Sequence, residues 1–141
     1  MPSILIIEDE PSQVETFIDY LEAVGWNVGH ARTGSDGIDR MSEKRWDIIL
    51  LDIRMVRGKK IPVGQRLTTG VYLLDQIRRG NLAPLTPKDT FVIVRTAVGD
   101  EDVIAQVEEL EPDALLLKGT DLAVIMQEID RGRSLLIPCH S

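Results

Sequence analysis

Four unbroken runs of apolar residues recur along the chain, at residues 4–7, 48–51, 91–94 and 114–117. Runs of this kind are typical of parallel strands that are covered on both faces, whereas strands with one wet face alternate apolar and polar residues. A weaker segment at residues 26–31 fits a fifth strand nearer an edge. The chain is therefore restricted to folds that bury a parallel sheet.

The segments between these runs have helical periodicity. Apolar residues follow i, i+3, i+4, i+7 spacing at Val14, Phe17, Ile18 and Leu21. Pro11 suits the opening turn of that helix and Gly25 its end, and similar patterns stop before Gly80, Pro112 and Gly132. A less periodic stretch at residues 35–44 must also cross between two strands. Alternating units of this size predict right-handed crossovers and a doubly wound α/β fold with five parallel strands.

Length and composition limit the remaining possibilities. A chain of 141 residues with 43% hydrophobic residues suits one domain, expected over residues 1–133 with a tail at 134–141. No apolar stretch approaches the ~20 residues that cross a bilayer, and no signal-peptide pattern opens the chain, so we expect a cytoplasmic location without membrane contact. A net charge of −7 argues against direct nucleic-acid binding. The lone Cys139 is expected to be an ordinary thiol.

Polar residues follow the apolar runs where each predicted strand ends. Glu8 and Asp9 leave the first strand, Asp52 ends the third, Thr96 the fourth and Lys118 the fifth. Sites in open α/β sheets form beyond the carboxyl ends of the strands, so we expect these side chains to converge. Each alone is also compatible with a helix cap or a solvated loop end. Their joint occurrence favours a site.

Three convergent carboxylates repel one another unless a cation is supplied. Mg²⁺ prefers hard oxygen ligands and suits such a cluster. With the metal present, the carboxylate of an Asp can attack phosphorus as a nucleophile. Lys118 would pair with a phosphoryl oxygen and Thr96 would donate a hydroxyl hydrogen bond. The pattern therefore predicts phosphoryl transfer.

With these motifs, the chain resembles the receiver domain of two-component response regulators from residue 4 to about residue 133. The matching pieces are Ile-Leu-Ile-Ile-Glu-Asp-Glu-Pro at 4–11, Asp-Ile-Ile-Leu-Leu-Asp-Ile at 47–53, Val-Arg-Thr-Ala at 94–97 and Leu-Leu-Leu-Lys at 115–118. The resemblance implies a flavodoxin-like fold with strand order 2-1-3-4-5. It also implies the following roles: phosphoacceptor Asp52, metal-binding pair Glu8 and Asp9, a further metal ligand in the main-chain carbonyl of Arg54, switch hydroxyl Thr96 and phosphoryl-pairing Lys118.

The resemblance further implies partners and a mode of action. A sensor histidine kinase or phosphotransfer protein would donate the phosphoryl group, and a downstream protein effector or output domain would read changed protein contacts. The helical face at residues 121–131 and the segment after Thr96 would make those contacts. Such a receiver phosphorylates and dephosphorylates itself and is not a turnover enzyme.

The chain departs from the family pattern in several places. Gly119 replaces the usual Pro after the pairing lysine, and Leu115 replaces the usual aromatic. Residues 54–70 form an enlarged basic segment, either a partner-docking loop through Arg57, Lys59, Lys60 and Arg66 or a solvated insertion. Arg54 and Val98 occupy positions that influence hydrolysis, and we expect a long-lived phosphoryl form.

Other interpretations of the same residues are less consistent with the sequence. A haloacid dehalogenase-type phosphatase needs a second Asp where Arg54 stands, and a P-loop needs residues that flank Gly58-Lys59 differently. A pseudo-receiver that acts only as a protein-binding module stays open. His30 is expected to be a packed or exposed residue of the second strand, and Trp26 and Trp46 to pack beside strands.

Overall fold

Strands and helices alternate along the described part of the chain. The computed structural model describes residues 2–53, 69–96, 101–117, 119–120 and 122–136. The strands are β1 (Ser3–Ile7), β2 (Asn27–Ala31), β3 (Ile48–Asp52), β4 (Phe91–Thr96) and β5 (Ala114–Leu117). The helices are α1 (Pro11–Ala23), α2 (Gly34–Glu43), α3 (Thr69–Arg78), α4 (Glu101–Glu109) and α5 (Leu122–Leu136).

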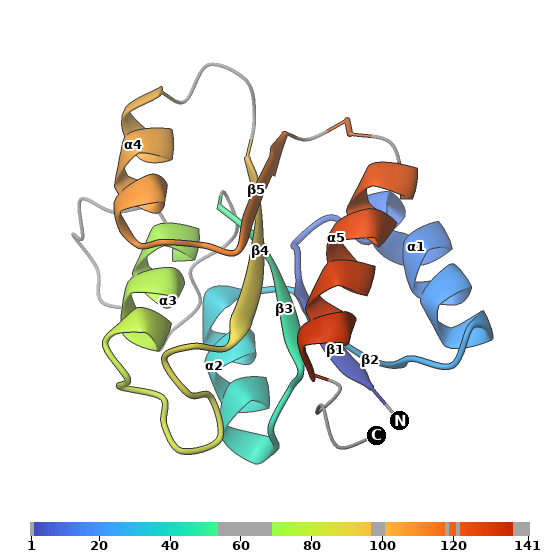
Figure 1. Cartoon of the computed structure of the whole chain (residues 1–141), viewed down its shortest axis with the longest axis horizontal. Helices are drawn as coiled ribbons and strands as arrows, with labels where there is room; N and C mark the ends of the chain where they lie inside the picture. Colours follow the sequence, from blue (N-terminus) through green and yellow to red (C-terminus); the bar gives the residue numbers. More distant parts are fainter. Residues whose placement is uncertain (1, 54–68, 97–100, 118, 121, 137–141) are drawn as a thin grey trace.

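The five strands form one parallel sheet in the order β2-β1-β3-β4-β5. Figure 1 shows α1 and α5 on one face of the sheet and α2, α3 and α4 on the other. The predicted doubly wound α/β fold and its strand order are confirmed. Because the order reverses between β1 and β3, their carboxyl ends lie beside each other at the switch point of the sheet.

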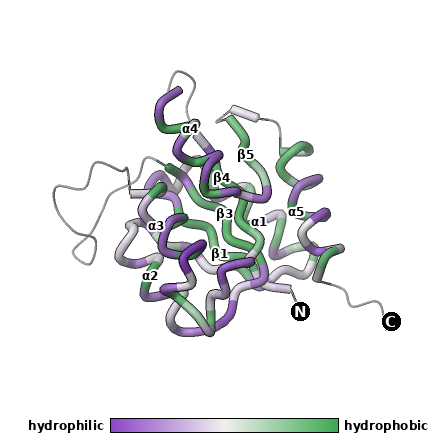
Figure 2. The backbone as a smooth tube through the Cα atoms, turned by 60° about the vertical axis from the view of Figure 1, so that its left-hand side comes forward, coloured by the Kyte–Doolittle hydropathy of each residue, from purple (hydrophilic) through white to green (hydrophobic). Residues whose placement is uncertain are grey.

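Each face of the sheet has its own hydrophobic core, and the central strands β1, β3 and β4 are buried along their full length. Figure 2 shows the hydrophobic colour concentrated along these strands. Alternate residues point to opposite faces, so Ile6 and Leu50 pack toward α1 and α5 whereas Leu5 and Leu51 pack toward α2 and α3. The central strands thus form a rigid base for the residues that follow them.

The two tryptophans pack as predicted. Trp26 and Trp46 are only 4% and 5% exposed. The Trp46 ring lies against Gly29 of β2, where an added Cβ would come within 2.4 Å of the ring. Its indole Nε1 donates a hydrogen bond to the carbonyl of Arg40 at 3.0 Å. Trp46 therefore joins α2 to the edge of the sheet.

The end of α5 differs from the sequence-based expectation. The helix passes through Gly132 and reaches Leu136, so the expected tail from residue 134 begins inside a helix. The reason is packing, because a Cβ on Gly132 would lie 2.8 Å from the Phe91 ring. The glycine permits α5 to approach β4 closely and does not terminate the helix. None of the helices in the described ranges is long and apolar enough to span a membrane.

One arginine joins α3 to the start of β4 and to the segment before β5. The Arg78 guanidinium donates hydrogen bonds to the carbonyls of Lys88, Thr90, Leu110 and Glu111 at 2.7–3.2 Å. It also forms an ion pair of 3.1 Å with Asp113, whose carboxylate accepts from the Val92 amide at 2.8 Å. This network fixes β4 and β5 at the ends opposite the candidate site.

Candidate functional site

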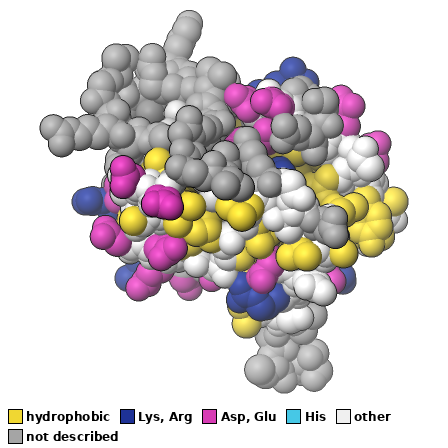
Figure 3. Space-filling model, turned by 90° about the horizontal axis from the view of Figure 1, so that it is seen from above, with side chains coloured by type: hydrophobic (Ala, Val, Ile, Leu, Met, Phe, Trp, Pro, Cys, Tyr) yellow, Lys and Arg dark blue, Asp and Glu magenta, His cyan; other side chains and the backbone are white. Residues whose placement is uncertain are grey.

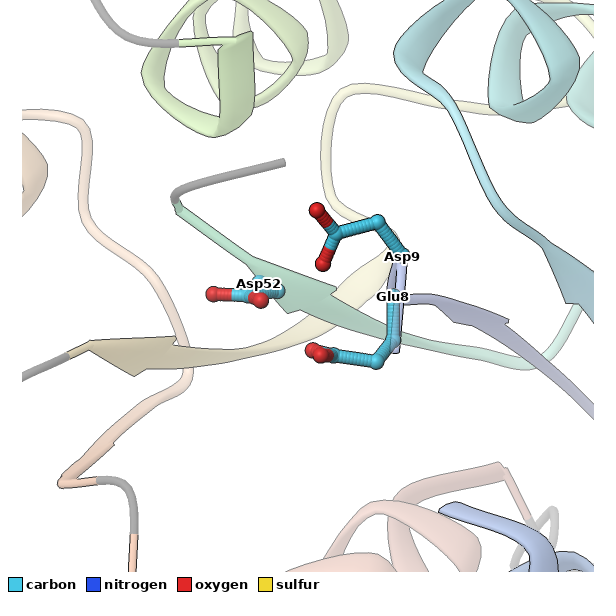
Figure 4. Close-up of side chains that lie close together, drawn as sticks. All are labelled: Glu8, Asp9 and Asp52. Carbon is cyan, nitrogen blue, oxygen red and sulfur yellow. The ribbon is translucent and has the colours of Figure 1, made fainter. Parts of the chain in front are cut away.

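Three carboxylates meet where β1 and β3 end. Asp52 is the last residue of β3, and Glu8 and Asp9 directly follow β1. One carboxylate oxygen from each residue lies within 4.8 Å of those of the other two. Figure 4 shows Glu8 and Asp9 extending from the end of β1 toward the side on which Asp52 lies. The predicted convergence of these three residues is therefore observed.

Burial makes this cluster electrostatically demanding. Glu8 is 1% exposed and Asp52 is 2% exposed, whereas Asp9 is half-buried. Like charges in a site of reduced dielectric repel more strongly than in water. A small hard cation lowers this cost, and three carboxylate oxygens are the donor set that such a cation prefers. The residues present fit Mg²⁺.

The turn that carries Glu8 is held by the neighbouring strand β2. The Glu8 amide donates to the carbonyl of Ala31 at 2.9 Å. The Glu8 carbonyl accepts a hydrogen bond of 2.8 Å from Nε2 of His30. His30 is half-buried and thus has a positioning contact in addition to the strand location expected from the sequence. Its role depends on the pairing of β1 with β2, which periodicity along β2 alone does not reveal.

The end of β3 is held by the first turn of α3 and by β4. The amide of Gly70 donates to the carbonyl of Ile53 at 3.0 Å, and the Ile53 amide donates to the carbonyl of Arg95 at 3.1 Å. A Cβ on Gly70 would lie 2.4 Å from the Cα of Ile53 and 2.6 Å from the carbonyl oxygen of Asp52. Gly70 therefore permits α3 to lie directly against the backbone that presents Asp52.

Thr96 ends β4, the strand next to β3, and is 1% exposed. The structure thus places this predicted residue at the same edge of the sheet as the acidic cluster. Lys118, the Arg54 carbonyl, Val98 and the basic segment at 54–68 lie outside the described residues. Leu115 packs against the core on the α2 to α4 face, and Gly119 has a φ of +91°, a conformation that favours glycine.

One buried charged residue near the site was not singled out from the sequence. Arg95 pairs in register with Asp52 on the adjacent strand and is 9% exposed. It stands in β4 between the apolar residues 91–94 and Thr96. A charge directly after a predicted buried run, before the residue that ends the strand, was the signal that could have identified it, because buried cations need a partner or a function.

Comparisons with known proteins agree with this geometry. A family model for the response regulator receiver domain matches residues 4–130. The transcriptional regulatory protein ZraR of Salmonella typhimurium is 27% identical over 132 residues, which cover 92% of this chain and 26% of that protein. TcrX of Mycobacterium tuberculosis, named as a transcriptional regulator, is 24% identical over 141 residues, which cover 96% of this chain and 56% of that protein.

Solved structures give the same result. The non-phosphorylated receiver domain of HemR from Leptospira biflexa superposes with a TM-score of 0.75 at 25% identity, covering 98% of each chain. The signal receiver domain of a histidine kinase from Syntrophus aciditrophicus gives a TM-score of 0.74 at 25% identity, covering 95% of this chain and 91% of that one. The chain spans about half the length of TcrX and about a quarter of ZraR. The family match, the strand order and the cluster of Glu8, Asp9 and Asp52 agree. The chain belongs to the response regulator receiver domain family.

Proposed function

We propose that this receiver accepts a phosphoryl group on Asp52 from the phosphohistidine of a sensor histidine kinase or phosphotransfer protein, with Mg²⁺ bound beside it. The observation that carries the proposal is the meeting of Glu8, Asp9 and Asp52 within 4.8 Å at the switch point of the sheet. The acceptor stands on a fully buried central strand, so its position is well defined. Family membership supports the same assignment.

In the proposed transfer, an Asp52 carboxylate oxygen forms a bond to phosphorus while the bond between phosphorus and the donor imidazole nitrogen breaks. The leaving nitrogen keeps the bonding electron pair. Glu8, Asp9 and Asp52 would hold the metal with the main-chain carbonyl of Arg54, and the bound ion would neutralise charge on the carboxylates and phosphoryl oxygens. Thr96 would donate its hydroxyl hydrogen bond to the phosphoryl group, and Lys118 would pair with one of its oxygens.

The proposed output is a changed contact with a downstream effector or output domain. Receiver domains are signalling modules, and the longer relatives named as transcriptional regulators suggest that such a partner can lie in the same polypeptide or act in trans. The proposed location is the cytoplasm, where phosphohistidine donors and their receivers meet. The modification itself is self-catalysed from the donor and needs no separate turnover substrate.

Acetyl phosphate with Mg²⁺ tests the proposal directly. Intact-mass spectrometry should show addition of one phosphoryl group to the wild type and none to Asp52→Asn. Asp19→Asn is the matched control, because it makes the same chemical change at an exposed position of α1 and should leave phosphorylation intact. No Mg²⁺-dependent addition to the wild type, or equal addition to Asp52→Asn, would overturn the assignment and favour a pseudo-receiver.

A further inference from the structure

A second concave site lies on the α1 and α5 face of the sheet. It is a pocket of about 610 Å³, within the ~300–1,000 Å³ range of small-molecule sites. Its apolar wall includes Phe17 of α1, Leu50 of β3 and Ile125 of α5. Arg95 of β4 also lines it, whereas Glu8 and Asp52 do not. The pocket is thus adjacent to the acidic cluster but separate from it.

Arg95 contributes a buried guanidinium to this pocket. Phe91 and Ile93 of the same strand point into the core beneath α1 and α5, so by strand alternation Arg95 points to the same face. The residue is only 9% exposed, and its buried Nε has no hydrogen-bond partner within the described part of the chain. Arginine stays protonated in proteins and loses hydration when buried. A buried donor left unused at a pocket wall is costly and indicates a ligand.

The opposite rim adds to the positive potential. Gly119 and Thr120, shortly before α5, line the pocket, and so does Leu122, which opens that helix. Amide groups in the first turn of a helix lack partners within the helix, and the helix dipole favours anions there. The helix terminus and Arg95 therefore favour the same sign of ligand charge. Figure 3 shows hydrophobic side chains exposed on the face of the molecule seen from above.

We propose that this pocket binds a small amphiphilic oxyanion, with a carboxylate or phosphate head and an apolar body. The planar guanidinium of Arg95 would hold two oxygens of the head group, and the apolar body would pack against Phe17, Leu50 and Ile125. The charge and the apolar wall together exclude a purely polar ion and a neutral lipid as good ligands. This inference does not depend on phosphorylation of Asp52.

A titration of the full chain with octanoate tests the head-group requirement. The amide chemical shifts report the binding. We expect saturable shifts around the pocket with octanoate, with octyl phosphate as the arm that distinguishes a phosphate head from a carboxylate. Neutral octanol and cationic octylammonium should bind at least about tenfold more weakly, a difference of ~1.4 kcal/mol. Equal binding of octanol would overturn the proposal, since it would make the site a simple apolar cleft.

Arg95→Met tests the cation, because it keeps an unbranched side chain of similar length. Octanoate affinity should fall at least about tenfold, and the melting temperature without ligand should rise because a poorly satisfied buried charge is removed. Arg79→Met, at the exposed position that directly follows α3, is the matched control and should change neither quantity. Unchanged affinity in Arg95→Met would overturn the proposal. A fall in melting temperature would also count against it, because it would make Arg95 a structural counter-ion of Asp52.

Three further variants keep the test decisive if Arg95→Met folds poorly. Thr16→Trp adds an aromatic ring at the pocket rim from an exposed position of α1 and should abolish octanoate binding, whereas Glu15→Trp on the neighbouring exposed position should not. Asp52→Asn should bind octanoate as the wild type does. Binding retained in Thr16→Trp would overturn the proposed location, and binding lost in Asp52→Asn would assign it to the acidic cluster instead.

Discussion

At the scale of single residues, the acidic cluster combines burial with like charge. Glu8 and Asp52 are almost inaccessible to water, and the half-buried Asp9 lies close to both just beyond the end of β1. Hydration cannot screen such charges as it does at the surface. Affinity of this cluster for a divalent cation should therefore appear as added stability of the folded state, because the site exists only there.

We predict that Mg²⁺ raises the melting temperature of the wild type. A ligand that binds only the folded state adds about 2.7 kcal/mol to the unfolding free energy at a hundredfold excess over its dissociation constant. Differential scanning calorimetry with and without Mg²⁺ measures this difference. Asp9→Asn should reduce the shift strongly, whereas Asp19→Asn should keep it. An equal shift in both variants would assign the metal effect to another part of the surface.

A second residue-scale prediction concerns Gly70. Ala favours a helix over Gly by roughly 1 kcal/mol, but overpacking costs about 1–3 kcal/mol. Here the added Cβ would meet the backbone of Asp52 and Ile53, which no rotamer change can relieve. We expect Gly70→Ala to slow phosphorylation by acetyl phosphate at least about tenfold through displacement of Asp52.

Gly37→Ala in α2 is the matched control for that experiment. Its Cβ would meet the flexible Cδ1 of Ile7 at 2.9 Å, so a side-chain shift can accommodate it. Initial rates of phosphorylation, measured for both variants at one Mg²⁺ concentration, separate the two cases. Equal rates in Gly70→Ala and the wild type would show that α3 does not set the position of Asp52, the proposed acceptor.

At this scale, the sequence best predicts the residues that lie directly at the ends of the strands. Glu8, Asp9 and Asp52 were predicted together because parallel strands end at a common edge of the sheet. The positioning contacts of His30 and the orientation of Arg95 were not predicted. Both depend on which strands are neighbours and on which face a residue points to, and these are properties of the assembled sheet.

At the scale of elements, Arg78 is the principal polar connection between α3, β4 and the approach to β5. It is the only arginine in the described ranges whose side chain donates to as many as four separate carbonyls. The fork geometry of guanidinium is needed to satisfy acceptors in several directions. Lysine, as a compact point charge with three donors, cannot replace it.

We predict that Arg78→Lys lowers the unfolding free energy by about 2 kcal/mol, because several backbone carbonyls, two of them in partly buried hydrogen bonds, lose their donor. Urea unfolding followed by tryptophan fluorescence measures the change as a lower midpoint with an unchanged slope. Arg79→Lys is the matched control. The Arg79 side chain, just beyond the end of α3, is mostly exposed and forms an ion pair with Asp75 of that helix. This carboxylate raises the pKa of Arg79 by hydrogen bonding and charge. Midpoints that fall equally in both variants would contradict a specific role for Arg78.

Helix boundaries show why the sequence predicts some elements better than others. Gly80 and Pro112 were expected beyond the ends of two helices, and α3 and α4 do end before them. Gly132 was expected to stop α5 but lies inside it. Glycine thus permits a change of chain direction at Gly80 and close packing on Phe91 at Gly132. Only the tertiary contact distinguishes these uses.

At the scale of the whole molecule, the sheet is rigid at its centre and more accessible at its two edges. β1, β3 and β4 are buried throughout, whereas β2 and β5 contain half-buried and exposed residues. The order of the strands accounts for this gradient, because β2 and β5 each have one unpaired side. Asp52 belongs to the rigid centre, and β5 belongs to an edge.

This gradient predicts the pattern of native-state hydrogen exchange. Amides of β1, β3 and β4 should exchange only through global unfolding, because every neighbouring strand must separate first. Amides of β5 should exchange at least about tenfold faster by local opening of the edge. NMR measures the exchange of both groups of amides. At a pH where reclosing is faster than chemical exchange, the rates give the two opening free energies directly. Equal protection of β5 and β3 would show that the edge is as rigid as the centre, and an acceptor at the centre could then transmit its state through β5 only by moving the whole sheet.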